Sequence, residues 1–274
     1  MPIAPSSTNA RRRPIFFASI ALVLTLTLSA CSVTGSDDAT PTPEPTATEI
    51  PIPTLEPGQE SVGDLLDRID AATLAVVSVR KVEWSSQTGD SLGTPAPTDV
   101  VYTEETIAPA SRRVVTTQGA TTTDEQLWVN GTTYFKGSSV ASYIAPYLGT
   151  GSWVQVDPAG VPETSTAGQN VAYLTAPIGA VYGTVSDDMR RRGITEGGTI
   201  EVSGRTCTVY TFVDTTSSGQ KIDYALSVDE KNLPCSLVQS ASGYANTTLF
   251  TFDDPSIAIT PPADAIVVSA TPEG

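Results

Sequence analysis

The feature that most constrains the fold is a long series of short strand patterns separated by turn residues. In each pattern, apolar or β-branched residues alternate with polar ones, which is the period of a strand with one buried face. The predicted strands span residues 77–84, 99–107, 112–118, 125–129, 132–135, 153–156, 199–203, 205–213, 221–229, 233–241 and 247–252. Asn130-Gly131, between two of them, strongly favours a two-residue hairpin turn. Short consecutive strands joined by such turns form an antiparallel meander, so a mainly β domain is expected.

One helix is predicted before the first strand, over residues 62–75. The preceding Ser61-Val62-Gly63-Asp64 resembles a capping box with Asp in place of Glu. Leu65, Leu66 and Ile69 then recur at the spacing of one helical face. The β-branched residues from Val76 onward switch the pattern to strand.

A second helix is predicted between Thr175, as its N-cap, and Gly193, just after its end. Three arginines at 190–192 occupy its last turn, where positive charge complements the helix dipole. Its apolar residues lie four or fewer positions apart on one face: Ile178, Val181, Tyr182, Val185 and Met189. No further element is expected after Ile266, where the tail is predicted to be loose.

The N-terminus has the pattern of an export signal. Three arginines at 11–13 precede an apolar run at 15–28, which is about 21 Å long as a helix. A membrane-spanning helix needs about 20 apolar residues, so the run is too short for a permanent span. Leu28-Ser29-Ala30-Cys31 then resembles a bacterial lipobox, which implies a diacylglyceryl group on Cys31 as the first mature residue. The alternative is an ordinary secretory signal followed by a chance cysteine.

The predicted domain organisation follows from this signal. Residues 1–30 form the signal peptide, and residues 31–59 contain the acylated Cys31 and a Pro/Thr-rich tether. Prolines at alternate positions favour extended polyproline II in the tether. The tether is either a spacer of selected length or a disordered tail whose length is not under selection. Residues 60–270 form the folded domain. The protein is therefore expected outside the cytoplasm, held at the bacterial cell membrane through the lipid on Cys31.

Charge and composition exclude several classes of function. Removing residues 1–30 removes three arginines and no acid, which leaves 12 basic and 30 acidic residues and a net charge of −18. Such a chain is unsuited to nucleic acid, whose affinity comes from clustered Lys and Arg. The chain has no histidine, so a Ser-His-Asp triad and histidine metal sites are excluded. No metal and no cofactor are predicted.

An enzyme is not expected. The acidic pairs Asp187-Asp188 and Asp253-Asp254 could be imagined as the two carboxylates of a glycosidase. Catalytic carboxylates face each other across the substrate and come from separate elements, whereas adjacent residues do not. The pairs are better explained as surface acids of a helix and a turn.

The two remaining cysteines, Cys207 and Cys235, are predicted to form a disulfide because exported proteins seldom keep free thiols. In a simple meander these residues lie on next-nearest strands, about 9.5 Å apart. A disulfide needs Cα atoms within about 7 Å. A bulge, a strand end or strong sheet curvature is therefore required for the bond.

The order of elements resembles the LppX/LprG group of lipoproteins, relatives of the LolA/LolB carriers. The resemblance covers residues 61–266, and its matching stretches are the hairpin at 128–134, Trp-Val-Asn-Gly-Thr-Thr-Tyr, and the segment 257–265. It implies an α+β fold in which a strongly curved antiparallel sheet, a half-barrel, carries about two helices on its concave face. It also implies an apolar space between helices and sheet that holds acyl chains.

Two functions remain open. The first is binding or carriage of a lipid or acyl chain, with the ligand cavity lined by Leu66, Ile69, Ile178, Val181, Tyr182, Val185 and Met189. The second is a non-enzymatic sensor, assembly or structural module, in which the same residues fill a closed core and the partner is another protein. The ligand and any protein partner are not identified by the sequence.

Overall fold

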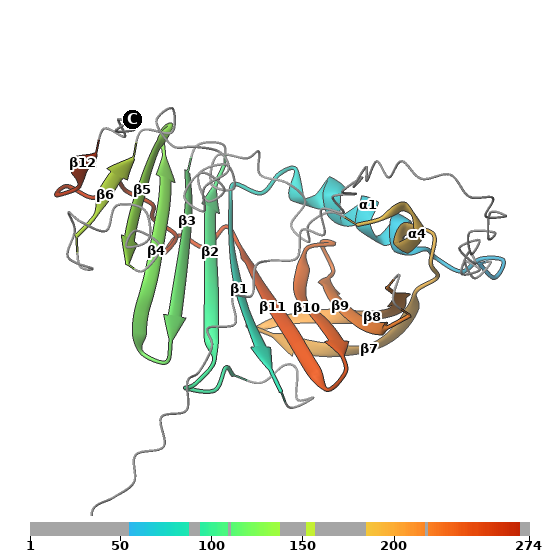
Figure 1. Ribbon diagram of the computed structural model, residues 1–274. Coiled ribbons are helices and arrows are strands. Elements are labelled where there is room, and N and C mark those ends of the chain that lie inside the picture. Colours follow the sequence, from blue (N-terminus) through green and yellow to red (C-terminus); the bar gives the residue numbers. More distant parts are fainter. Residues whose placement is uncertain are drawn as a thin grey trace, which may run out of the picture. The chain divides into compact units, whose positions relative to one another are not determined.

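The computed structural model describes residues 55–87, 94–108, 111–137, 152–156, 185–216 and 219–268. Within these residues the chain forms one curved twelve-stranded sheet with two helices (Figure 1). The helices are α1 (Val62–Thr73) and α4 (Asp187–Arg190). The strands are β1 (Ser78–Ser86), β2 (Val100–Ile107), β3 (Ser111–Gln118), β4 (Thr121–Val129), β5 (Thr132–Gly137), β6 (Val154–Val156), β7 (Thr195–Val202), β8 (Arg205–Thr215), β9 (Lys221–Asp229), β10 (Pro234–Ala241), β11 (Tyr244–Phe252) and β12 (Ile266–Val268).

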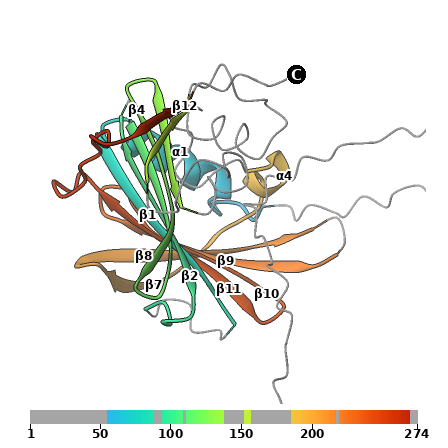
Figure 2. The ribbon, with the colours of Figure 1, turned by 60° about the vertical axis from the view of Figure 1, so that its left-hand side comes forward.

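The strand order is β12-β6-β5-β4-β3-β2-β1-β11-β10-β9-β8-β7. Two meanders, β1–β6 and β7–β11, are joined where β1 pairs with β11, and Figure 2 shows β7, β8 and β9 running across the direction of β1. The predicted Asn130-Gly131 turn is confirmed: both residues have positive φ, and Val129 pairs with Thr132 across them. The predicted series of strands is likewise confirmed.

The last strand corrects two predictions. Residues 266–268 form β12, which pairs in parallel with β6, so the chain is not loose directly after Ile266 and the sheet is mixed rather than purely antiparallel. Ile266 lies opposite Val154, more than a hundred residues earlier in the chain. A three-residue strand that depends on so distant a partner has no local signature.

Helix α1 is confirmed with its cap. The Ser61 hydroxyl accepts a hydrogen bond from the Asp64 backbone N–H at 3.1 Å, and the Asp64 carboxylate accepts one from the Ser61 N–H at 3.1 Å. These hydrogen bonds, led by the one from the Ser61 hydroxyl at 2.7 Å, lower the pKa of Asp64 below its ordinary value of 3.8. The capping box therefore fixes the first turn of α1.

Replacing Ser61 by alanine is expected to lower the free energy of unfolding by about 1 kcal/mol, because an N-cap hydrogen bond is lost. The contribution of the Asp64 carboxylate is fully present above the ordinary Asp pKa of 3.8 and is lost as the pH falls through the lower pKa of the folded state. Urea unfolding at neutral pH measures the first effect, and an NMR titration of Asp64 should give a higher pKa in S61A. Ser61→Thr keeps a capping hydroxyl, so an equal loss in S61T and S61A would contradict this role.

The second predicted helix is not continuous through residues 185 and 186. Ser186 has an extended backbone and accepts a hydrogen bond from the Met189 N–H, so it begins the four-residue helix α4 rather than continuing an earlier one. Ser186 followed by Asp187 and Asp188 is typical of a helix N-terminus. The helical spacing of the apolar residues continues on both sides of Ser186 and therefore predicted one longer helix. Residues 157–184, including the predicted N-cap Thr175, lie outside the described residues.

The sheet has two faces that are used differently. We call the side that contacts α1 the helix face; Phe212, Leu226, Leu237 and Phe250 contribute side chains to it. Figure 1 shows α1 and α4 beside each other over the β7–β11 part of the sheet. Because successive strand residues point to opposite sides, the neighbours of these residues form the opposite face.

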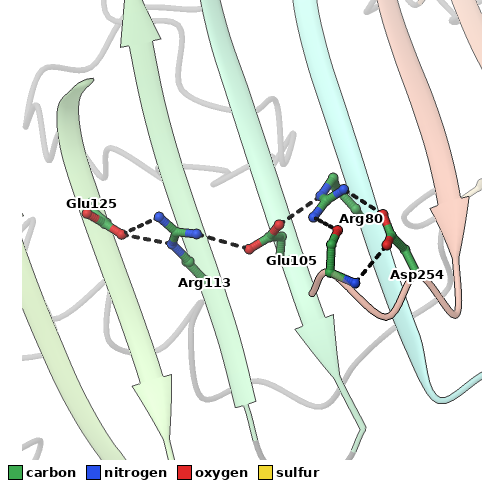
Figure 3. A network of polar contacts seen from close by, with 6 residues as sticks. Arg80, Glu105, Arg113, Glu125 and Asp254 are labelled. Atoms are coloured by element: carbon green, nitrogen blue, oxygen red, sulfur yellow. Dashed lines mark hydrogen bonds and ion pairs between the residues drawn. The ribbon is translucent and has the colours of Figure 1, made fainter. Parts of the chain in front are cut away.

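Ion pairs cross the opposite face from β1 to β4 (Figure 3). Arg80 contacts Glu105 at 2.7 Å, Glu105 contacts Arg113 at 3.2 Å, and Arg113 contacts Glu125 at 2.7 Å. Arg80 also contacts Asp254 at 2.8 Å, which fixes the start of the segment after β11. Glu105 is buried, and its two arginine partners compensate for the loss of water around its charge.

The segment after β11 then covers apolar side chains on the same face. Ile257 and Ile259 pack against Leu127, Val129 and Tyr134 of the β4–β5 hairpin. This cluster brings the chain back across the sheet toward β12.

The disulfide between Cys207 and Cys235 is present, with Cα atoms 6.5 Å apart. Cys207 pairs with Asp229 at the very end of β9, and the β9–β10 register shifts between Pro234 and Ser236, which leaves Cys235 in a bulge. The sequence predicted that the bond needs a bulge, a strand end or strong curvature. The structure has both a strand end, at Asp229, and a bulge, at Cys235.

Candidate ligand cavity

The predicted ligand-lining residues that fall within the described chain lie in or against a packed core. Leu66 and Ile69 are 2% and 0% exposed and belong to the cluster that joins α1 to the helix face. Val185 and Met189 are partly buried against the same cluster. Ile178, Val181 and Tyr182 lie outside the described residues. A cavity lined by all seven residues therefore stays a prediction.

A cavity of about 630 Å³ lies elsewhere, beside the start of the folded domain. Its walls come from the chain before α1, from the segment leading into β7, and from β8, β9 and β10. The lining residues are Leu55, Gln59, Arg192, Gly193, Thr195, Thr211, Phe212, Val213, Asp223, Tyr224, Ala225, Val238 and Ser240. The cavity is partly open to solvent.

One wall of the cavity is held by main-chain pairing between distant segments. The Val62 N–H donates to the Arg192 carbonyl at 2.8 Å, and the Ile194 N–H donates to the Glu60 carbonyl at 3.0 Å. Gly193 lies between them, and a Cβ on this residue would come within 2.4 Å of the Gln59 side chain. The absence of a side chain at Gly193 thus lets Gln59 approach closely.

The floor of the cavity is formed by strands β8, β9 and β10, and its lining includes Phe212 of the helix face and Tyr224, the register partner of Phe212. Val213, Ala225 and Val238 lie on neighbouring strands, and the register pairs Ala225 with both Thr211 and Val238. Val238 is 5% exposed, whereas Val213, nearer the sheet edge, is 37% exposed. The polar residues Thr211, Asp223 and Ser240 lie beside these apolar residues in the lining, so the floor is mixed, with Val213 as an accessible apolar position.

The charged groups around the cavity are paired with one another. Arg192 contacts Asp214 at 2.9 Å, and Lys221 contacts Asp223 at 2.7 Å. Burial, and then the negative charge of Asp214, raise the pKa of Tyr224, so its hydroxyl stays protonated at neutral pH. Equal numbers of positive and negative groups suit a neutral, apolar ligand better than an anionic one.

The acidic pairs have structural contacts. Asp188 pairs with Arg191, and Asp253 accepts hydrogen bonds from the N–H groups of Val77 and Ser78 at 2.8 and 3.1 Å. In the part of the chain that the structure describes, no cluster of three or more acidic, Cys or His residues could hold a metal ion. The helices of this part are all too short or too polar to span a membrane.

Sequence reasoning did not find the cavity residues. Alternation along β8–β10 indicates strands, but it does not tell which face is packed and which adjoins a cavity. The wall depends on the pairing of residues 59–62 with residues 192–194. This pairing joins segments far apart in the chain, so no local sequence pattern predicts it. The available signal was Leu55, an apolar residue near the end of the proline-rich segment.

No protein-family model matches the sequence, and a search of curated proteins gives no match. Lipoprotein LppX of Mycobacterium tuberculosis is a similar solved structure, with 12% identity over 73% of this chain and 98% of that chain and a TM-score of 0.41. LprF of Mycobacterium bovis has 16% identity over 75% and 100% of the two chains and a TM-score of 0.42.

The complex of MucA and MucB from Pseudomonas aeruginosa gives 16% identity over 76% of this chain and 63% of that chain, with a TM-score of 0.37. The lipoprotein group that the sequence resembles is thus represented among the similar structures by LppX. All three TM-scores are below 0.5, and the fold described above rests on this chain's own strand pairing.

Proposed function

We propose that this protein is an extracytoplasmic lipoprotein that binds a neutral lipid or an acyl chain in the cavity between Leu55 and strands β8–β10. The observation that carries the proposal is the cavity itself. Its volume of about 630 Å³ lies within the roughly 300–1,000 Å³ typical of small-molecule sites. Val213, Ala225 and Val238 offer apolar contacts to such a ligand, and the paired charges beside the cavity favour a ligand that needs no counter-charge.

The anchor belongs to the same proposal. Residues 1–30 are removed on export, Cys31 carries the lipid, and residues 31–59 connect the membrane to the domain at residues 60–270. The basic start, the short apolar run and the Leu-Ser-Ala-Cys sequence support this organisation. An anchor of this kind keeps the cavity near a membrane that supplies acyl chains.

The alternative is a module that binds another protein and has a closed core. The packing of Leu66 and Ile69 against the sheet agrees with a closed core at α1. The separate cavity has no role in that alternative, so ligand binding at the cavity distinguishes the two functions.

Filling the cavity is expected to weaken binding of an apolar probe. Val213 on β8 is 37% exposed and lines the cavity, whereas Val100 on β2 is 39% exposed and does not. In the mature chain carrying Cys31→Ser, to prevent acylation, V213W should weaken binding of the neutral dye Nile red about tenfold or more, a cost of about 1.4 kcal/mol. A fluorescence titration measures the affinity.

The matched variant V100W should leave the affinity within about twofold of the parent. Both substitutions place tryptophan at a similarly exposed strand position, so a general effect on the sheet would appear in both. Unchanged dye binding in V213W would contradict the proposed site.

A further inference from the structure

The cavity lies where strand β7 stops short of its neighbour. Thr195 at the start of β7 pairs with Thr211, whereas β8 continues beyond Thr211 with no further partner in β7. The residues just before β7 pass beside this part of β8, because Arg192 contacts Asp214 at 2.9 Å. Arg192 lines the cavity, and its carbonyl accepts the hydrogen bond from the Val62 N–H at 2.8 Å. Both the backbone and the side chain of Arg192 are therefore held in the cavity wall.

The guanidinium of Arg192 has one donor group that the fold leaves unpaired. Its terminal Nη2 forms the ion pair with Asp214, but its Nε is buried and has no hydrogen-bond partner among the described residues. Buried donors are nearly always paired, so a buried N–H without a protein partner calls for a partner that the chain does not supply. The Arg192 side chain is 15% exposed, so part of it remains accessible beside the cavity.

Two other polar side chains of the lining are used within the protein. The Gln59 amide donates to the Ile194 carbonyl at 3.3 Å, and its oxygen accepts from the Glu56 N–H at 3.3 Å. The Thr211 hydroxyl donates to the Thr195 carbonyl at 3.4 Å. In contrast to these groups, the Nε of the neighbouring arginine is left available for a ligand.

The charge of Arg192 is already balanced, which decides what kind of ligand group it can bind. Asp214 neutralises the guanidinium, and burial followed by the charge of Asp214 raises the pKa of Tyr224, so this hydroxyl adds no charge to the cavity. A carboxylate or phosphate would bring a second negative charge beside Asp214, and like charges in contact are unfavourable. An uncharged carbonyl oxygen accepts a hydrogen bond without this penalty.

We infer that the Arg192 guanidinium donates a hydrogen bond, through Nε, to an uncharged carbonyl oxygen of the ligand. The apolar part of the ligand then lies against Val213, Ala225 and Val238. The inference rests on the proposed function, because it names the ligand class of the same cavity: a neutral lipid with an ester or ketone group rather than a plain hydrocarbon. Arg192 is thus a specificity-determining residue, since it separates ligands of similar apolar surface.

Two probes of similar size test this specificity: 1-dodecylpyrene, which has no acceptor, and methyl 1-pyrenedodecanoate, which has an ester. Both affinities are measured by fluorescence titration of the mature chain carrying Cys31→Ser. Arg192→Met with Asp214→Asn removes the donor and balances the lost charge. This variant should bind the ester about tenfold more weakly than the parent, and the hydrocarbon within about twofold of the parent. An equal loss for both probes would show a merely structural role for Arg192 and overturn the inference.

Arg191→Met with Asp188→Asn is the matched control. This ion pair precedes Arg192 in the chain, its side chains are 62% and 64% exposed, and neither residue lines the cavity. The control should keep both affinities within about twofold of the parent. Arg192→Lys keeps a cation beside Asp214 but lacks Nε, so it should lose the ester preference and decides the matter if the double variant fails to fold.

The variant V213W separates the inference from the proposed function. If V213W weakens both probes about tenfold but R192M/D214N changes neither affinity, the cavity binds the ligand and the inference about Arg192 is wrong. If V213W leaves both affinities unchanged, the ligand site itself is wrong and the inference fails with it. A loss confined to the ester in R192M/D214N, with both probes weakened in V213W, supports both.

Discussion

Replacing Ile69 by alanine is expected to lower the free energy of unfolding by about 2–5 kcal/mol. Ile69 is 0% exposed and lies in the cluster formed by α1, Phe212, Leu226 and Phe250. The substitution removes buried methyl groups and leaves a void that the sheet cannot fill by itself. Urea unfolding followed by circular dichroism measures the loss, because the linear extrapolation gives the free energy in water.

The matched control lies at the C-terminal end of the same helix. Leu74 is 87% exposed, so Leu74→Ala should change stability by no more than about 0.5 kcal/mol. I69A should also keep its affinity for Nile red, because Ile69 is absent from the cavity lining. If Ile69 instead lines the ligand site, I69A will lose little stability and will change the affinity for the dye.

Removing the disulfide is expected to cost about 3–4 kcal/mol. Cys207 and Cys235 are separated by 28 residues, and closing a loop of this length restricts the unfolded chain by that amount in the chain-entropy model. Both cysteines are buried at 0% exposure against Val202 and Leu249, so the double variant C207S/C235S also places two hydroxyls in an apolar cluster. Thermal or urea unfolding of the double variant measures the total.

Reduction provides the complementary measurement, because it removes the bond without changing the side chains' shape. The parent carrying Cys31→Ser should be destabilised by reductant, whereas C207S/C235S should not respond further. Equal stability of the parent with and without reductant, after the thiols are shown to be free, would contradict a stabilising disulfide.

The parts of the fold that could be predicted are those with local signals. Ser61 and Asp64 predicted the start of α1, and Asn130-Gly131 predicted the β4–β5 turn. Both features are local, because the capping box and the turn each form between residues within four positions of one another. The β8–β11 strands followed from alternation alone. Ser186 was missed because the apolar periodicity around it was given more weight than its capping chemistry.

The parts that could not be predicted depend on distant partners. Strand β12 forms because Ile266 pairs with Val154 of β6. The cavity wall forms because the Ile194 N–H donates a hydrogen bond to the Glu60 carbonyl. The disulfide was predictable in part. The sequence indicated which two cysteines pair, but it did not indicate where the bulge lies that brings their Cα atoms to 6.5 Å. The apolar spacing of Leu66 and Ile69 likewise fits a packed core as well as a cavity.

The most direct test of the ligand site is extraction of the purified protein. The mature chain carrying Cys31→Ser, exported with a secretory signal and purified without detergent, is extracted with organic solvent and its lipids are measured by mass spectrometry beside V213W and V100W. The proposed function predicts roughly one lipid or acyl ligand per chain in the parent and V100W, and about tenfold less in V213W. No acyl material in the parent, or equal amounts in V213W and V100W, would contradict it.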